Sequence, residues 1–311
     1  MASFSSAGPT ALATLKPDVT AVGTNFYTAA QTVNSSGDLY DASGWTITQG
    51  TSFSAPLVAG AVALLKSAKP GLSAAQYRSL IINSARALPI NDQTASPTLA
   101  GGGLLDLSRA VSSTLTASPT SVDFGAGRNT VDGSVDVRVT NTGAGTDTFS
   151  ATVETAAGAL APATTPSTFT LDPGATQTVT VTLSGKDLDP GSYSGFVTFA
   201  GTTGASETRV PYWFGSAGST PAGIAILQTG SGSARQSVSR AIVLRVVDIA
   251  GLGLDIRPTV EADASGARVN SVYPTGDIAG TYAVDIRLGT SNATFTITVG
   301  DVKQTAIVGL N

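Results

Sequence analysis

The spacing of apolar residues in this 311-residue sequence changes near Thr114, and this change limits the folds that the chain can adopt. Before Thr114, an apolar run from Leu57 to Leu65 and a second set between Ser73 and Arg86 recur at helical intervals. After it, short runs alternate between apolar and polar residues and are separated by turns rich in Gly, Pro, Asn and Asp. A chain of this length can form two or three domains. The sequence therefore predicts an α/β part followed by all-β domains.

The first predicted helix contains a proline near its start. Pro56 lacks the N–H of other residues and is tolerated in a first helical turn, where that group has no intrahelical partner. We therefore expect the helix to begin close to Ser52 and to end before Lys69-Pro70-Gly71. The second helix is expected to span residues 73–86 with Ser73 as its N-cap.

Two sets of strands are predicted beyond Thr114. Each set resembles a β-sandwich of about one hundred residues, which is an ordinary domain size. We therefore divide the chain into residues 1–114, 115–215 and 216–311. The predicted strands of the first set are 135–141, 149–153, 176–183, 195–199 and 208–214, and those of the second are 224–227, 241–248, 259–262, 280–288 and 293–299.

Composition excludes several kinds of site. The net charge is −4 and the 17 Lys and Arg residues are scattered, so nucleic acid is not an expected partner. The sequence has neither Cys nor His, which removes disulfides, thiolate and imidazole metal ligands and a cysteine nucleophile. The acidic turns at Asp187, Asp189 and Asp277 lack the ligand density of a calcium loop. We expect no metal and no cofactor.

The low charged fraction of 12% and the 35 glycines are typical of β-rich extracellular modules. Residues 1–10 show neither the basic nor the apolar region of a signal peptide, and the apolar run at 57–65 is too short to span a bilayer. We expect no membrane span and no signal peptide in this chain, and an extracellular or cell-surface parent protein.

Four motifs stand out in the first part of the chain: Ala2–Pro9, Leu15–Ala21, the stretch Gly50-Thr51-Ser52-Phe53-Ser54-Ala55-Pro56, and Gly102–Ala110. They occur in the order found in the subtilase family of subtilisin-like serine proteases, and the stretch at residues 50–56 closely resembles the family's nucleophile motif. Ala7 and Val22 stand where Arg and Pro are more usual. The resemblance covers residues 1–114 and implies a partial α/β subtilisin-like segment, from the C-terminal part of the catalytic domain.

This resemblance implies that Ser52 is the candidate nucleophile, with Gly50, Thr51, Ala55 and Pro56 as its supporting motif. In the family, a His accepts the serine proton, an Asp orients that His, and an upstream Asn stabilises the oxyanion. The backbone N–H of Ser52, at the helix N-terminus, is then the oxyanion donor that remains. In one member of the family, loss of the Ser or the His lowers turnover by about 10⁶-fold. We therefore expect a truncated hydrolase that lacks its His, Asp and oxyanion Asn and is not a competent protease.

Alternatives stay open at each of these positions. Ser52 is either a nucleophile or a helix N-cap with a structural role. Asp38 and Asp41 are candidates for a weak base, although Asp is common in turns. Lys66 lies about 21 Å from Ser52 along a helix, which excludes a Ser-Lys pair, whereas Lys16 is not excluded by spacing.

The two β-domains carry weaker resemblances. Residues 115–215 look like the fibronectin-III-like or immunoglobulin-like domains appended to bacterial subtilases, on Phe124-Gly125, Val139–Gly143 and Leu171–Gly174. Residues 216–311 look like a bacterial Ig-like repeat, on Val246–Asp248 and Gly280–Tyr282. The chain is then a truncated hydrolase, a Ser52-dependent carboxylesterase for small or activated esters, or a non-catalytic extracellular binding or structural module.

A small ester or a peptide is the expected substrate if the chain is a hydrolase. In the complete family fold, a parallel sheet from the upstream part covers the helix that begins near Ser52. Here Leu57, Leu64 and Leu65 would lack much of that cover. At about 25 cal/mol per Å², several wet apolar side chains cost several kcal/mol. This surface can repack against the first β-domain or pair with another copy of the chain, and we predict a homodimer or larger assembly in which residues 1–114 form the contact.

Overall fold

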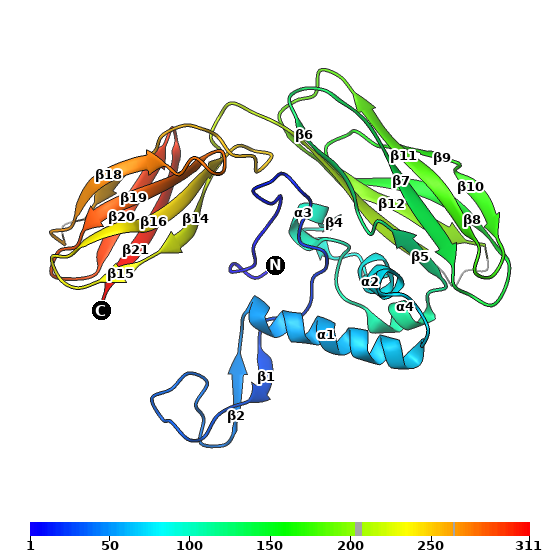
Figure 1. The fold of residues 1–311 in the computed structure, drawn as a ribbon, viewed down its shortest axis with the longest axis horizontal. Helices are drawn as coiled ribbons and strands as arrows, with labels where there is room; N and C mark the ends of the chain where they lie inside the picture. The colour runs from blue at the N-terminus through cyan, green and yellow to red at the C-terminus, as the bar shows by residue number, and fades with distance from the viewer. Residues whose placement is uncertain (203–206, 264) are drawn as a thin grey trace.

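The computed structural model describes residues 1–202, 207–263 and 265–311. Figure 1 shows three parts: an N-terminal part that carries the helices, and two β-rich parts that lie on either side of the N-terminal segment. Strands dominate the described chain, as expected for a partial subtilisin-like segment followed by β-sandwiches.

The N-terminal part has a small core where three helices meet. Leu65, Leu80 and Ala110 come from different helices and are fully buried together. The elements are β1 (Phe26–Ala29), β2 (Trp45–Thr48), α1 (Thr51–Ala68), α2 (Ala74–Asn83), β3 (Pro89–Ile90), β4 (Gln93–Thr94), α3 (Pro97–Ala100) and α4 (Leu107–Ser112).

Both predicted helices form, with different ends. Because α1 begins at Thr51, Pro56 is its sixth residue and lies beyond the first turn, so the prediction of a first-turn proline is wrong. Ser73 caps α2 as predicted, and its side chain and that of Gln76 bond each other's backbone N–H. The helix ends at Asn83 rather than at residue 86, because Arg86 pairs with Leu104 in a β-bridge.

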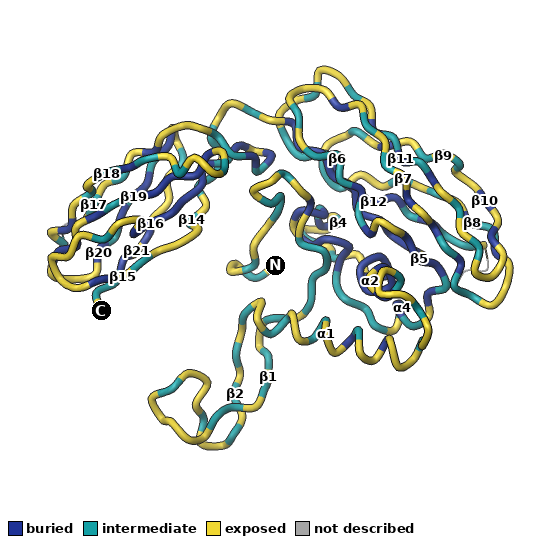
Figure 2. The backbone as a smooth tube through the Cα atoms, viewed as in Figure 1, coloured by how far each residue is buried: buried dark blue, intermediate teal, exposed yellow. Residues whose placement is uncertain are grey.

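Helix α1 is largely uncovered. Of its 18 residues, Ala61 and Leu65 are buried, whereas the Leu64 side chain is 61% exposed. Figure 2 shows the helix as a run of exposed and half-buried backbone beneath the buried α2. At 18 residues and a mean hydropathy of 1.3, α1 meets the length and composition of a membrane span, a weak indication that core helices of soluble proteins also satisfy. The prediction of no membrane span stays a prediction.

The first β-sandwich follows directly after α4. Its core lies between the two sheets, where Val137 and Val179 from one sheet meet Phe149 and Phe199 from the other. The five predicted runs all form strands, and the structure adds the short strands at both margins. One sheet has the order β5 (Leu115–Ser118), β7 (Val131–Asn141), β11 (Thr176–Gly185), β9 (Ala163–Thr165), and the other β10 (Thr168–Leu171), β8 (Asp147–Ala157), β12 (Gly191–Gly201), β13 (Glu207–Ser216), β6 (Val122–Gly127).

The second β-sandwich has two four-stranded sheets. Buried Ile242 and Val284 from one sheet pack against Phe295 and Ile297 from the other. Two predicted ranges, 259–262 and 293–299, match their strands at both ends. The sheet orders are β14 (Gly223–Thr229), β16 (Ser237–Val247), β19 (Thr281–Arg287), β18 (Arg268–Pro274), and β15 (Ser231–Gly232), β21 (Val302–Leu310), β20 (Ala293–Val299), β17 (Thr259–Ala262).

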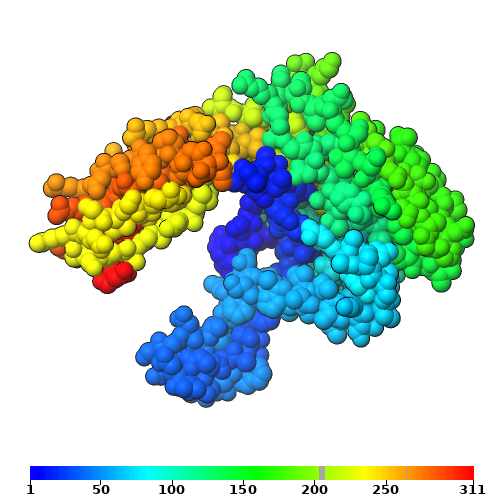
Figure 3. Space-filling model, in the orientation of Figure 1, coloured from blue at the N-terminus to red at the C-terminus, as the bar shows by residue number. Residues whose placement is uncertain are grey.

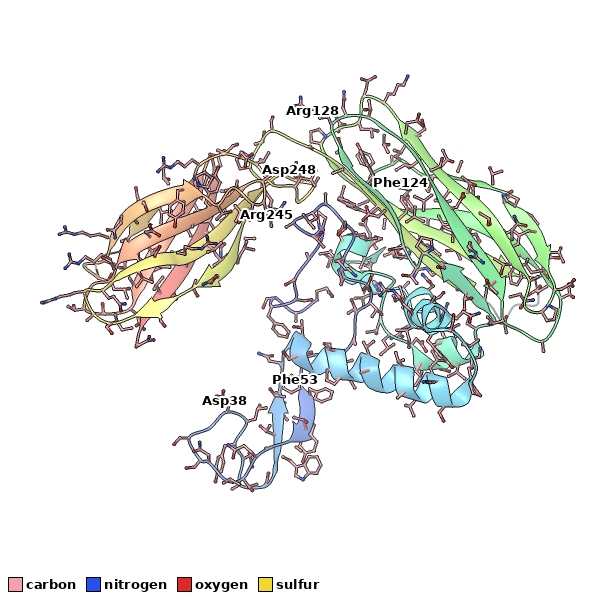
Figure 4. The ribbon with its side chains drawn as sticks, viewed as in Figure 1. Asp38, Phe53, Phe124, Arg128, Arg245 and Asp248 are labelled. Carbon is pink, nitrogen blue, oxygen red and sulfur yellow. The ribbon has the colours of Figure 1, made fainter. Side chains whose placement is uncertain are left out.

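All three parts meet around Trp213 of β13. The buried indole packs with Leu15 from the N-terminal segment and with Leu252 from the second sandwich. Beside it, the carboxylate of Asp248, labelled in Figure 4, accepts hydrogen bonds from the backbone N–H groups of Gly218 (2.7 Å) and Leu252 (2.8 Å). The chain between the sandwiches is therefore anchored by buried contacts.

Candidate active site

Ser52 is the second residue of α1, and its side chain is exposed. The helix N-cap is Gly50, and it makes no side-chain capping bond. The interpretation of Ser52 as an N-cap is therefore wrong. Its backbone N–H belongs to the first turn, where amide groups have no partner within the helix and form the positive end of the helix dipole.

Gly50 gives this turn its shape. Its φ of 149° lies in a region that favours glycine, and its N–H donates to the carbonyl oxygen of Gly23 over 2.8 Å. A side chain at Gly23 would meet the carbonyl oxygen of Gly50 at 2.9 Å and the Ser54 hydroxyl at 2.4 Å. Close packing of the two glycines therefore fixes the start of α1 against the segment before β1.

Two cavities lie beside the start of α1, on a face that does not include Ser52. Thr51 and Ser54 line both cavities, which measure about 350 Å³ and about 400 Å³. Ala55 lines the first of them, together with Ser5 of the N-terminal segment. Ser52 lies about 100° around the helix from Thr51 and is not among the residues that line either cavity. Sequence reasoning missed these cavity residues, although Ala55 and Thr51 were named as motif support.

Pro56 has a direct effect on the Ser52 backbone. A proline in the helix interior lacks the N–H that would bond the carbonyl four residues before it. That carbonyl belongs to Ser52, because α1 already includes both residues. The first turn of α1 therefore leaves both the N–H and the carbonyl of Ser52 without an α-helical partner.

The two acids considered as weak bases for Ser52, Asp38 and Asp41, lie in the loop between β1 and β2. Asp38 lies in the loop that joins β1 and β2, as Figure 4 shows. In the same loop, the carboxylate of Asp41 accepts hydrogen bonds from the hydroxyl and the backbone N–H of Ser43, which lower the pKa of Asp41. Both acids therefore occupy turn positions, and Asp41 stays ionised as a turn-stabilising carboxylate.

Of the two lysines considered as partners of Ser52, Lys16 forms an ion pair with another residue and Lys66 is exposed. The ammonium of Lys16 lies 2.6 Å from Asp18, which also pairs with Arg78 at 3.1 Å. Lys66 is exposed in the last turn of α1, at the opposite end of the helix from Ser52. Over the described residues, the Ser52 hydroxyl has no hydrogen bond to any candidate base.

The β1–β2 hairpin next to Ser52 was not predicted. Its strands pair Tyr27 with Ile47 and Ala29 with Trp45 on one face, and these four residues are exposed. The rings of Tyr27 and Trp45 stack with centroids 5.4 Å apart. Each strand has only four residues, but β2 alternates Trp and Ile with Thr, a signal that could have revealed it.

Oxygen ligands for a metal do not gather in the described part of the chain, where no group of three or more Asp or Glu residues is close enough to hold an ion. The candidate site is therefore a serine in the first turn of an apolar helix, together with its own backbone amide.

Two family models match the chain in succession. Residues 1–127 match the family described as the subtilase family, and residues 110–213 match one described as an Fn3-like domain. The first turn that carries Ser52 thus lies in the part of the chain that is similar to a subtilase, and the β-sandwich after it lies in the part that is similar to an Fn3-like domain. Specifically, the chain contains a subtilase-family segment followed by an Fn3-like domain.

Curated relatives share this segment. The chain is 35% identical over 136 residues to the subtilisin-like protease SBT3.4 of Arabidopsis thaliana. The aligned region covers 40% of this chain and 17% of that protein. It is 35% identical over 127 residues to the minor extracellular protease Vpr of Bacillus subtilis (strain 168), covering 40% of this chain and 15% of that protein. The chain therefore spans less than a fifth of the length of these relatives.

Solved structures resemble the chain only distantly. A protein of unknown function from Porphyromonas gingivalis W83 covers 64% of this chain and 99% of its own, with a TM-score of 0.32 and 13% identity. A likeness of this size carries no argument about function.

Proposed function

We propose that this chain carries the nucleophile segment of a subtilisin-like serine hydrolase, with Ser52 as the nucleophile, and that the 311 residues alone do not cleave peptide bonds. The observation that carries the proposal is the state of the Ser52 hydroxyl: exposed in the first turn of α1 and not hydrogen-bonded to a base among the described residues. Peptide cleavage requires a group that takes the serine proton and returns it to the leaving amine. The sequence contains no histidine to do so.

Ester hydrolysis is the activity that this geometry supports best. An activated ester expels a leaving group that needs little protonation, so the general acid matters less than for an amide. The unpartnered N–H of Ser52 and the positive end of α1 would stabilise the developing oxyanion. The proposed substrate is therefore a small or activated ester, and turnover is expected to be slow.

A non-catalytic extracellular module is the second candidate. It is favoured by the size of the two sandwiches, each with its own buried core. In this proposal, residues 115–215 and 216–311 are immunoglobulin-like domains, the latter a bacterial Ig-like repeat. The parent protein would act outside the cell or at its surface, in keeping with the Bacillus subtilis relative, which is named a minor extracellular protease.

Two substrates, casein and p-nitrophenyl butyrate, and one labelling reagent, a fluorophosphonate probe, separate these candidates. The purified chain is compared with Ser52→Ala and with Ser67→Ala, which removes another exposed hydroxyl from the same helix. We expect no casein cleavage, and slow ester hydrolysis and probe labelling that Ser52→Ala abolishes and Ser67→Ala retains. Casein cleavage that Ser52→Ala abolishes would overturn the claim that the chain is not a peptidase. Equal ester turnover in all three proteins, without labelling, would overturn Ser52 as nucleophile and favour the non-catalytic module.

A further inference from the structure

Four exposed arginines gather at one end of the second sandwich. Arg268 begins β18 and Arg287 ends β19, while Arg235 and Arg240 flank the start of β16. The opposite ends of β16 and β19 face the junction near Asp248, so the arginines lie at the end away from the rest of the molecule. Figures 1 and 3 show this end of the sandwich projecting freely, and nitrogen-tipped side chains extend from it in Figure 4.

The strand register places two of these like charges directly opposite each other. Arg268 pairs with Arg287 across the antiparallel β18–β19 ladder. Val269 and Ile286, the next pair, belong to the core, so both arginines lie on the outer face of the sheet. Like charges at directly opposite positions destabilise a sheet. This pairing is therefore an arrangement that folding alone does not favour.

The other two arginines are fixed by their backbone. Arg240 lies within a bulge of β16, between Val238 and Ile242, with a φ of 50°, and its N–H donates to the carboxylate of Asp285 over 2.8 Å. Arg235 has a φ of 62°, and its N–H donates to the carbonyl oxygen of Gly289 over 2.9 Å. Their main chains are thus held beside the Arg268–Arg287 pair.

The carboxylates of Asp263 and Asp285 offset part of the positive charge of the four arginines, but both are hydrogen-bonded to other groups and leave the guanidinium groups unpaired among the described residues. Asp285 accepts hydrogen bonds from the hydroxyls of Ser239, Ser271 and Tyr273 as well as from the Arg240 N–H, and these bonds lower its pKa. Asp263 is likewise occupied by the N–H groups of Ser265 and Thr294. Over the described residues, none of the four guanidinium groups forms an ion pair.

We propose that this arginine cluster, Arg235, Arg240, Arg268 and Arg287, is a binding site for an anionic polysaccharide. Guanidinium groups bind carboxylate and sulfate oxygens through paired N–H donors. The exposed hydroxyl of Ser237, which lies beside Arg287 in the sheet, adds a partner for a sugar hydroxyl. Single-stranded nucleic acid fits less well, because the Tyr273 side chain on this face is half-buried and its hydroxyl is bound to Asp285, which leaves the ring poorly placed for base stacking.

Because the whole chain carries a net charge of −4, the arginine cluster attracts a polyanion only over a short distance. At physiological salt the screening length is about 8 Å, so a polyanion at the distal end interacts with the local positive charge rather than with the acidic remainder. Binding should therefore be strongly dependent on salt and should involve the distal end alone.

The test measures binding of the full chain to immobilised dextran sulfate, with neutral dextran and duplex DNA as comparisons. The variant Arg268→Gln with Arg287→Gln keeps the aliphatic stems and removes two charges. The matched control, Arg257→Gln with Lys303→Gln, removes two exposed charges from the same sandwich away from the cluster. Thermal unfolding of each variant verifies that it is folded.

We expect binding to dextran sulfate and not to neutral dextran. The cluster variant should bind about tenfold more weakly, with the slope of log affinity against log salt reduced by about two, one per charge removed. The single variant Arg287→Gln should give about half of that change in slope. The control pair should change affinity less than about twofold. Failure to bind dextran sulfate, equal weakening by both pairs, or tighter binding to duplex DNA would overturn the proposal.

Discussion

The side-chain amide of Asn83 donates a hydrogen bond to the carbonyl oxygen of Arg209, 2.9 Å away, and joins α2 of the subtilase segment to a strand of the Fn3-like sandwich. The same amide donates to the carbonyl oxygen of Thr120 over 2.8 Å, and its oxygen accepts from the Ser79 hydroxyl. Asn83 is 1% exposed, so these groups have no access to water. The subtilase segment and the first sandwich are therefore locked together by a buried polar contact.

Replacing Asn83 with Ala should destabilise the protein by about 2–3 kcal/mol, because two buried carbonyl groups lose their donor. Chemical denaturation followed by circular dichroism measures the change. Asn129→Ala, at an exposed position without side-chain hydrogen bonds, is the matched control and should change stability little. Equal midpoints for both variants would show that the Asn83 contact does not hold the two parts together.

Asp285 should make the second sandwich less stable in acid. Its folded pKa lies below the unfolded value of about 3.9, so its contribution is present above that pH and is lost as pH falls through the folded pKa. Asp285→Asn should therefore lower the thermal midpoint near neutral pH, and the difference from wild type should shrink in strong acid. The exposed Asp301→Asn serves as control. A difference that stays constant with pH would contradict this assignment.

A protein consisting of residues 115–311 should fold on its own. Each sandwich has a complete core, and the buried contacts around Asp248 between them are retained apart from Leu15. Circular dichroism should show a cooperative thermal transition. If this shortened protein is unfolded while the full chain is folded, the proposed division at residue 115 is wrong.

We propose that the full chain forms a homodimer through α1. Leu57 and Leu64 line an apolar groove of about 400 Å³ between α1 and the segment around Leu105, and Leu64 is 61% exposed. Leu64→Gln should weaken the dimer, because the buried apolar area falls. Leu227→Gln, at a leucine that is 57% exposed in the second sandwich, should not.

Sedimentation equilibrium at micromolar concentration measures both variants beside the wild type. A wild-type monomer would reject dimerisation. It would also show that the exposed face of α1 is tolerated in water or covered by another partner.

Local sequence signals predicted much of the secondary structure. The Ser73 capping residue, the strand at Thr259–Ala262 and the strand at Ala293–Val299 were read from residue type and alternation alone. Strands such as β9 and β10 were missed, since three or four residues of mixed polarity carry too little periodicity. Their pairing with longer strands supplies the hydrogen bonds that define them.

For the candidate site, the sequence by itself determined the nucleophile motif around Ser52, its family resemblance and the lack of histidine, because these depend only on residue identity and order. Tertiary structure decided that Gly50, not Ser52, caps α1, and that Ser52 lines neither of the two cavities beside the start of the helix. It also placed Arg268 opposite Arg287, which are 19 positions apart in the chain. The physical reason is that helix capping, burial and strand register depend on which distant backbone groups meet, and no single stretch of sequence specifies those contacts.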